Sequence, residues 1–146
     1  MSGAADSTPD RAAGASRRST VGRRGLRVLL VDDHVLTRCR TRQQVEEIPF
    51  LQVVAEATDG LEAVALARTL SPDLVLMDIS MPEMDGIEAT RRITSEFPHI
   101  RVIMLSSYDD QSFQEGSKAA GAHGYVVKGA STSRLAEAIG VIFGRG

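Results

Sequence analysis

Cysteine and aromatic residues are scarce in this chain of 146 residues, which has one cysteine, no tryptophan and 4% aromatic residues. A single cysteine excludes a framework of internal disulfides and fits a reducing compartment. With so few aromatic side chains, the core must be mainly aliphatic. The hydrophobic content of 42% is sufficient to build such a core.

Long hydrophobic runs are also absent. No apolar segment approaches the roughly 20 residues that a membrane-spanning helix needs. The N-terminus has no apolar stretch of the kind found in a secretory signal. We therefore expect a cytoplasmic protein, and the length is that of one ordinary domain.

The formal net charge of −2 is unevenly divided along the chain. Residues 1–25 carry five arginines and two aspartates, a net of +3. They are rich in Ala, Gly, Ser and Arg without hydrophobic periodicity, so we expect a disordered basic tail. Residues 26–146 carry a net of −5, which is not the electrostatic footprint of nucleic-acid binding. We expect this chain alone to bind neither nucleic acid nor membrane.

Residues 26–146 alternate between apolar segments of strand length and segments of helix length. The five candidate strands are 26–31, 51–55, 74–77, 100–105 and 125–127. Near-continuous apolar strands that alternate with helices predict an α/β fold with a parallel sheet covered on both faces. Right-handed crossovers favour a flavodoxin-like, doubly wound sheet of five strands in the order 2-1-3-4-5, with five helices.

Two of the five expected helices have weak patterns. The helix over 34–48 has a polar block at 40–44, which predicts a weakly amphipathic helix ended by Pro49. The helix over 110–120 contains Gly116, which makes it marginal by propensity.

Polar side chains follow four of the five expected strands. They are Asp32 and Asp33, Asp78, Ser106 and Lys128. In such sheets, sites form beyond the carboxyl ends of the strands, so these groups should converge. Three carboxylates suit a hard cation such as Mg²⁺. Asp78 could then attack phosphorus as a carboxylate nucleophile, with the Ser106 hydroxyl and the Lys128 ammonium on the phosphoryl oxygens.

Each of these residues also has an ordinary structural use. One of Asp32 and Asp33 could cap the following helix while the other stays in solvent. Ser106 could bond to backbone, Lys128 could be a solvated strand-end charge, and Tyr125 could be packing. The joint occurrence at four strand ends favours the site.

The chain resembles the receiver domain of two-component response regulators, and is most similar to the receivers that precede a LuxR-type helix-turn-helix domain. The resemblance rests on Val31-Asp32-Asp33-His34, Asp78 with Met81-Pro82 and Asp85-Gly86, Leu105-Ser106-Ser107, and Gly124-Tyr125 with Lys128.

The resemblance implies a phosphorelay protein whose Asp78 accepts a phosphoryl group from a sensor histidine kinase. Asp33, Asp78 and the Ser80 backbone carbonyl would ligate Mg²⁺ directly, and Asp32 would act mostly through water. Ser106 and Tyr125 would form the switch that alters the surface of the fourth helix, fifth strand and fifth helix. The protein would not be an enzyme beyond its own phosphorylation and slow dephosphorylation. Its downstream partner would be an output protein, an absent output domain or a second phosphorylated copy.

Several features depart from the family pattern. Thr41 and Gln44 stand where aliphatic residues are usual, and Ser117 and Lys118 stand where a small and then an aliphatic residue are usual. Gly129 follows Lys128, where many relatives have Pro after a cis bond. Since a cis bond before a residue other than Pro costs about 3–4 kcal/mol, we do not expect one here.

These departures leave two further interpretations open. One is a degenerate receiver used as an interaction module. The other is a DNA-binding regulator whose helix-turn-helix domain is absent from this chain. An aspartate-nucleophile phosphatase is disfavoured. Such enzymes have a second Asp two residues after the nucleophile, and this chain has Ser80 at that position. Ser80 and Tyr108 would flank the phosphoryl group, so we predict that substituting either changes hydrolysis more than phosphorylation.

Overall fold

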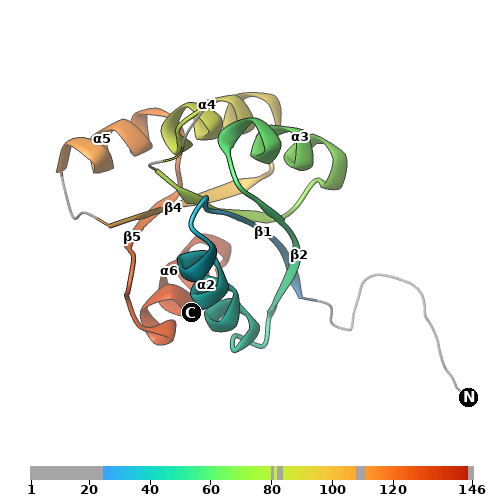
Figure 1. The fold of residues 1–146 in the computed structure, drawn as a ribbon, viewed down its shortest axis with the longest axis vertical. Helices are drawn as coiled ribbons and strands as arrows, with labels where there is room; N and C mark the ends of the chain where they lie inside the picture. Colours follow the sequence, from blue (N-terminus) through green and yellow to red (C-terminus); the bar gives the residue numbers. More distant parts are fainter. Residues whose placement is uncertain (1–24, 80, 82–83, 108–110, 145–146) are drawn as a thin grey trace, which may run out of the picture.

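The fold was analysed in a computed structural model, which describes residues 25–79, 81, 84–107 and 111–144. Five strands and five helices alternate along this part of the chain (Figure 1). The elements are β1 (Leu26–Val31), α2 (Val35–Glu46), β2 (Leu51–Ala57), α3 (Gly60–Leu70), β3 (Leu74–Asp78), α4 (Gly86–Glu96), β4 (Arg101–Ser106), α5 (Gln111–Ala119), β5 (Gly124–Val127) and α6 (Thr132–Phe143).

The strands form one parallel sheet in the order β2-β1-β3-β4-β5, which confirms the predicted fold. Figure 1 shows α3, α4 and α5 on one face of this sheet, and α2 and α6 on the other. In the described part of the chain, no helix is both long enough and apolar enough to span a membrane. The predicted tail falls almost entirely on residues 1–24, which lie outside the described residues, so its disorder stays a prediction.

Two hydrophobic clusters fill the spaces between the sheet and its helices. Successive side chains of a strand point to opposite faces, so each strand contributes to both clusters. On one side, Met77 and Met104 pack with α3 and α4. On the other side, Leu76 and Leu105 pack with α2 and α6. The buried side chains are almost all aliphatic, as the composition predicted.

The helix caps follow from local sequence. Asp59 is the N-cap of α3 and accepts a hydrogen bond from the Glu62 backbone N–H, while Glu62 accepts one from the Thr58 backbone N–H. This resembles a capping box, except that the return bond comes from Thr58, one residue before the N-cap. Asp85 is the N-cap of α4, and its side chain accepts a hydrogen bond from the Glu88 backbone N–H.

The predicted weakness of the first helix is confirmed in α2, where Val45 is the buried residue. A crevice of about 100 Å³ separates α2 from β5 and α6. Thr41 and Gln44 line it on one side, and Leu105, Val126 and Leu135 on the other. Polar side chains at these α2 positions do not pack closely against an apolar wall. Gln44 instead donates a hydrogen bond to the carbonyl of Ala130, in the loop between β5 and α6.

Candidate functional site

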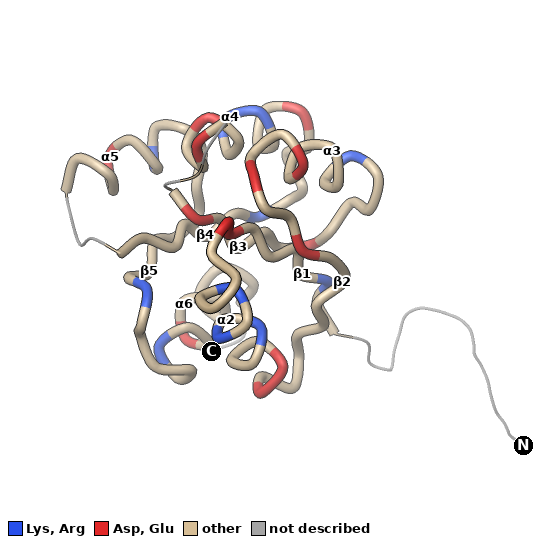
Figure 2. The backbone as a smooth tube through the Cα atoms, in the orientation of Figure 1, with Lys and Arg blue, Asp and Glu red and all other residues tan. Residues whose placement is uncertain are grey.

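The two-residue period of the strands brings the carboxylates together. Leu74 and Leu76 point toward α2 and α6, and Asp78 continues that alternation. Val28 and Leu30 point the same way on the neighbouring strand, and Asp32 follows them one residue past its end. Both carboxylates therefore lie on one side of the sheet at its carboxyl edge. Figure 2 shows acidic residues where β1 and β3 end.

Lys128 lies between these two carboxylates. Its Nζ is 3.0 Å from Asp32 Oδ2 and 3.1 Å from Asp78 Oδ1. Asp32 and Asp78 are each 3% exposed, so the cation compensates charges that burial would otherwise make costly. The ends of β1, β3 and β5 therefore meet in the structure, as predicted.

The electrostatics of Asp78 show that this compensation is incomplete. Burial raises the pKa of Asp78 to about 6, and the neighbouring Asp32 charge acts in the same direction, while Lys128 lowers it. Burial alone would lower the pKa of Lys128, but its hydrogen bonds to Asp32 and Asp78 raise it overall. One ammonium among three carboxylates leaves the site with excess negative charge.

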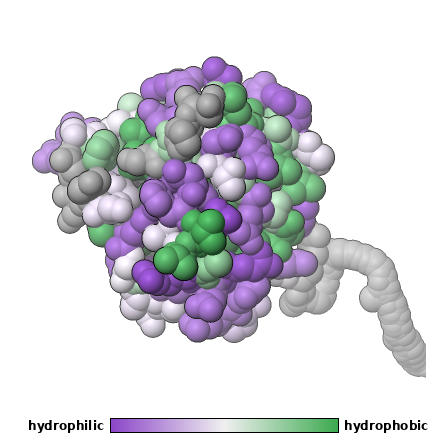
Figure 3. Space-filling view, viewed as in Figure 1, coloured by the Kyte–Doolittle hydropathy of each residue, from purple (hydrophilic) through white to green (hydrophobic). Residues whose placement is uncertain are grey.

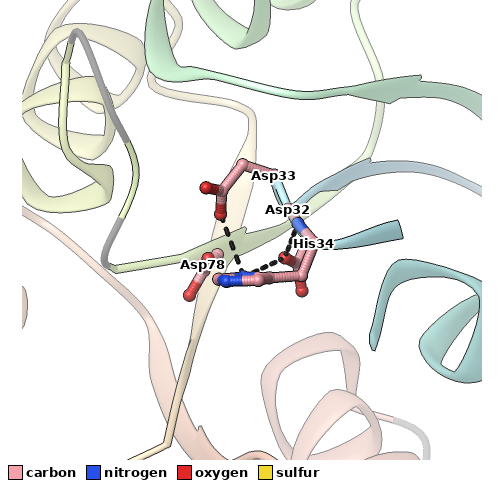
Figure 4. A group of neighbouring side chains, drawn as sticks. All are labelled: Asp32, Asp33, His34 and Asp78. Carbon is pink, nitrogen blue, oxygen red and sulfur yellow. Dashed lines mark hydrogen bonds and ion pairs between the residues drawn. The ribbon is translucent and has the colours of Figure 1, made fainter. Parts of the chain in front are cut away.

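Two oxygen atoms of the site have no hydrogen-bond partner among the described residues. They are Asp33 Oδ1 and Asp78 Oδ2, and both atoms are buried. Asp33 comes from the loop after β1, and Figure 4 shows it beside Asp78 with Asp32 and His34. One oxygen or nitrogen from each of these four residues lies within 4.8 Å of the others. Asp33 Oδ1 has an ion-pair contact with His34 Nδ1 at 3.2 Å, whereas Asp78 Oδ2 has no such contact among the described residues. Buried carboxylate oxygens that accept no hydrogen bond are suited to a divalent cation with oxygen ligands.

The oxygens of Asp32 are fully engaged by the protein. Its Oδ1 accepts the His34 backbone N–H at 2.8 Å, and its Oδ2 accepts the Thr37 hydroxyl at 2.9 Å as well as Lys128. Its backbone carbonyl accepts from Arg38, whose Nε also pairs with Glu56 on β2. The N-cap of α2 is His34, so neither Asp32 nor Asp33 occupies that position.

Thr37 and Arg38 were not singled out from the sequence. Thr37 lies one helical turn beyond His34, and a hydroxyl at that spacing after a strand-end Asp is a signal that could have identified it. Arg38 gives no such signal, because its partner Glu56 belongs to a different element.

The segment after Asp78 turns back tightly on β3. The Gly86 backbone N–H donates to the Ile79 carbonyl at 2.8 Å. A Cβ on Gly86 would lie 1.9 Å from the Asp78 carbonyl oxygen. Gly86 is the first residue of α4, and its lack of a side chain permits this close approach. Ser80 and Pro82 lie outside the described residues, so the predicted Ser80 ligand stays a prediction.

The two predicted switch residues lie on neighbouring strands. Ser106 is 3% exposed at the end of β4, and its carbonyl accepts the Lys128 backbone N–H at 2.7 Å. Tyr125 is half-buried on β5, where it packs against the α3/α4 cluster and lines a cavity of about 550 Å³ next to α5. Ser117 in α5 is buried, and its hydroxyl donates to the Phe113 carbonyl. All described peptide bonds are trans, including that between Lys128 and Gly129.

An apolar spot adjoins the acidic pocket. Val35 and Leu36, the first residues of α2, are 61% and 76% exposed. The space-filling view shows apolar atoms surrounded by hydrophilic ones over this part of the molecule (Figure 3).

These features define an α/β module with an acidic pocket at the carboxyl edge of its sheet. The chain belongs to the response regulator receiver domain family, whose sequence model matches residues 28–140.

The chain is similar to Response regulator GacA of Pseudomonas viridiflava, with 41% identity over 81% of this chain and 55% of that protein. It is also similar to the transcriptional regulatory protein LiaR of Bacillus subtilis, with 42% identity over 78% of this chain and 54% of that protein. The chain therefore spans about half the length of these curated relatives.

Solved structures agree with this assignment. A LuxR-family two-component response regulator from Aurantimonas sp. SI85-9A1 matches with a TM-score of 0.77 and 38% identity, over 83% of this chain and 87% of that chain. The signal receiver domain of the response regulator NarL from Mycobacterium tuberculosis matches with a TM-score of 0.79 and 29% identity, over 84% of this chain and all of that one.

Proposed function

We propose that Asp78 is the phosphoacceptor of a phosphorelay and that this chain acts as a phosphorylation-switched signalling module. The observation that carries the proposal is the placement of Asp78, a nearly fully buried carboxylate with one oxygen on Lys128 and the other without a partner among the described residues. A purely structural carboxylate in this position would be expected to have both oxygens satisfied.

The reaction proposed for this site is a phosphoryl transfer. A carboxylate oxygen of Asp78 attacks the phosphorus of a phosphohistidine or of acetyl phosphate, and the bond from phosphorus to the leaving group breaks as the acyl phosphate forms. Lys128, already 3.1 Å from Asp78 Oδ1, offsets the added charge, and Ser106 at the neighbouring strand end offers a hydroxyl to the phosphoryl oxygens. Later attack by water releases inorganic phosphate, and no independent substrate is turned over.

Mg²⁺ is the cofactor that fits the donor set. Asp33 and Asp78 each supply a buried oxygen that accepts no hydrogen bond among the described residues, whereas the Asp32 oxygens already accept three hydrogen bonds from the protein. This supports direct ligation by Asp33 and Asp78 and an indirect role for Asp32. When bound, Mg²⁺ would neutralise charge on the carboxylates and on the transferred group.

The proposed phosphodonor is a sensor histidine kinase in the cytoplasm. The exposed Val35 and Leu36 beside the pocket offer an apolar contact for the protein that brings the phosphoryl group. The proposed readout is a change on the surface formed by α5, β5 and α6, through Ser106 and Tyr125. An output protein, an output domain or a second phosphorylated copy would recognise that surface.

The test is phosphorylation with acetyl phosphate and Mg²⁺. Wild-type protein should gain the mass of one phosphoryl group, in a linkage that hydroxylamine cleaves, and Asp78→Ala should gain none. Asp59→Asn, which alters a carboxylate at the α3 cap, should behave as wild type and serves as the matched control. A wild-type chain that is never labelled, or an Asp78→Ala chain that is, would overturn the proposal.

A further inference from the structure

The imidazole of His34 has no role in the structure of α2. His34 is the N-cap residue, but its side chain makes no capping hydrogen bond. The hydrogen bonds of His34 at this end of α2 are made by its backbone. Its N–H donates to Asp32 Oδ1 at 2.8 Å, and its carbonyl accepts the Arg38 N–H at 2.9 Å. The ring is therefore available for another purpose.

The ring points into the acidic pocket. Its Nδ1 lies 3.2 Å from Asp33 Oδ1 and 3.5 Å from Asp32 Oδ1 (Figure 4). The His34 side chain is 65% exposed. It can thus move by a few tenths of an ångström without disturbing the core.

The spacing of these atoms is that of ligands around one ion. Neighbouring ligands of an octahedral ion with bonds of about 2.1 Å lie about 3.0 Å apart, and opposite ones about 4.2 Å apart. The separation of His34 Nδ1 from Asp33 Oδ1 is close to the first value, and all four residues offer an atom within 4.8 Å of the others. A contraction of about half an ångström would bring the widest pair within reach of a common ion.

A second observation points to a cation in the same place. Asp78 Oδ2 is buried and has no partner among the described residues, and Asp33 Oδ1, which is also buried and accepts no hydrogen bond there, has the His34 ring at 3.2 Å. Asp78 is 3% exposed and belongs to the same group of neighbouring side chains as His34 (Figure 4). An imidazole nitrogen beside two such oxygens is a mixed nitrogen and oxygen donor set.

We propose that His34 is a metal ligand together with Asp33 and Asp78, and that the pocket therefore binds late first-row divalent cations, of the class of Co²⁺ and Zn²⁺, more tightly than Mg²⁺. Imidazole suits these ions, whereas Mg²⁺ favours oxygen and keeps several waters. The inference rests on the proposed function for the location of the site, and it assigns to His34 the selection of the metal. With Mg²⁺ bound, His34 stays outside the coordination sphere.

The test compares cobalt and magnesium affinities of the whole chain by titration calorimetry. Cys39→Ser is the common background, because the exposed Cys39 thiol could itself bind Co²⁺. His34→Gln should weaken Co²⁺ binding by about tenfold or more and change Mg²⁺ binding by less than about twofold. His99→Gln, a histidine at the other end of the sheet, is the matched control and should change neither.

A spectroscopic readout identifies the ligand directly. The Co²⁺ complex should show a strongly shifted, exchangeable ring N–H proton resonance that is lost in His34→Gln and kept in His99→Gln. Equal Co²⁺ affinity in His34→Gln and its parent, or survival of that resonance, would overturn the proposal and leave His34 as an ion-pair partner of the carboxylates.

Failure of this inference is distinguishable from failure of the proposed function. Phosphorylation of Asp78 with acetyl phosphate and Mg²⁺ is measured on the Cys39→Ser parent, which keeps His34 and the other proposed ligands. If labelling proceeds and cobalt selectivity is unchanged, the inference about His34 alone is wrong. If wild-type protein is never labelled, the proposed function is wrong whichever way the cobalt titration falls.

Discussion

Asp78 is held in the folded chain at a free-energy cost whenever it is ionised. Burial raises its pKa from 3.8 to about 6 despite the nearby Lys128. A carboxyl group with a raised folded pKa binds its proton more tightly in the folded state than in the unfolded state. The folded state is therefore favoured below the unfolded pKa, and this advantage is lost as the pH rises to about 6.

Asp78→Asn should stabilise the metal-free protein in a pH-dependent way. We expect the variant to unfold with a free energy about 2–3 kcal/mol larger than wild type above pH 7, since each unit of pKa shift corresponds to about 1.4 kcal/mol. The difference should shrink as the pH falls from about 6 to about 4. Urea unfolding in the presence of a chelator measures it, and subtraction cancels the titration of other groups. A difference independent of pH would contradict the assignment.

At the residue scale, the sequence sufficed for Asp32, Asp33, Asp78 and Lys128. Each follows a strongly apolar strand, and the parallel topology leaves the carboxyl ends of strands at one edge. The hydrogen bonds from Thr37 and Arg38 to Asp32 were not predicted, because they depend on how α2 leaves that edge and on a partner in β2. The predicted roles of Ser106 and Tyr125 rest on family resemblance and remain to be tested.

Gly86 allows the start of α4 to lie directly against the backbone at the end of β3. A Cβ at Gly86 would meet the Asp78 carbonyl oxygen at 1.9 Å and the Asp78 carbonyl carbon at 2.8 Å. Backbone atoms cannot yield as a flexible side chain can. The site and the helix therefore cannot both keep their places with any other residue at this position.

Gly86→Ala should cost about 1–3 kcal/mol of stability, as overpacking does, and slow phosphorylation by acetyl phosphate at least about tenfold because Asp78 is displaced. Gly116→Ala in α5 is the matched control, since its Cβ would meet the Ile87 side chain at an ordinary 3.4 Å. It should stabilise the protein by about 0.5–1 kcal/mol. Urea unfolding and the rate of labelling test both. Normal labelling of Gly86→Ala would show that the loop can relax.

The crevice beside α2 predicts a stabilising substitution. Thr41 lines it opposite Leu105, Val126 and Leu135. Thr41→Leu should increase the free energy of unfolding by about 1 kcal/mol, because roughly one additional methylene becomes buried. Gln43→Leu, at an exposed position of the same helix, should give no gain. A loss of stability in Thr41→Leu would mean that the crevice is too narrow to fill.

At the element scale, strongly periodic segments were predicted well and weakly periodic ones only in outline. The apolar runs predicted the positions of β1 and β3. In contrast, β2 continues to Ala57, two residues beyond the predicted end. Glu56 is polar and ends the apolar pattern, but its pairing with Leu30 of β1 and its ion pair with Arg38 keep it in the strand. A tertiary contact of this kind is invisible to local periodicity.

The molecule as a whole has an acidic folded part and a basic N-terminal segment. The sheet, both clusters and every described site residue lie within residues 25–144. Residues 26–146 should therefore unfold with the same free energy as the full chain, within about 0.5 kcal/mol. They should also give no gel shift with DNA, since their net charge is −5. Urea unfolding and a mobility assay of both chains check these outcomes, and a shift with residues 26–146 would contradict the second.

Lys128 directly follows β5, the last strand, and this late place in the chain also determines when the site can form. During synthesis, Asp32, Asp33 and Asp78 emerge from the ribosome well before the lysine that lies between two of them. β5 pairs only with β4 at the sheet edge, so it joins after the rest of the sheet can form. A nascent chain thus holds carboxylates without their cation. The proposed phosphoryl transfer to Asp78 therefore requires that Lys128 has been synthesised and that β5 has joined the sheet.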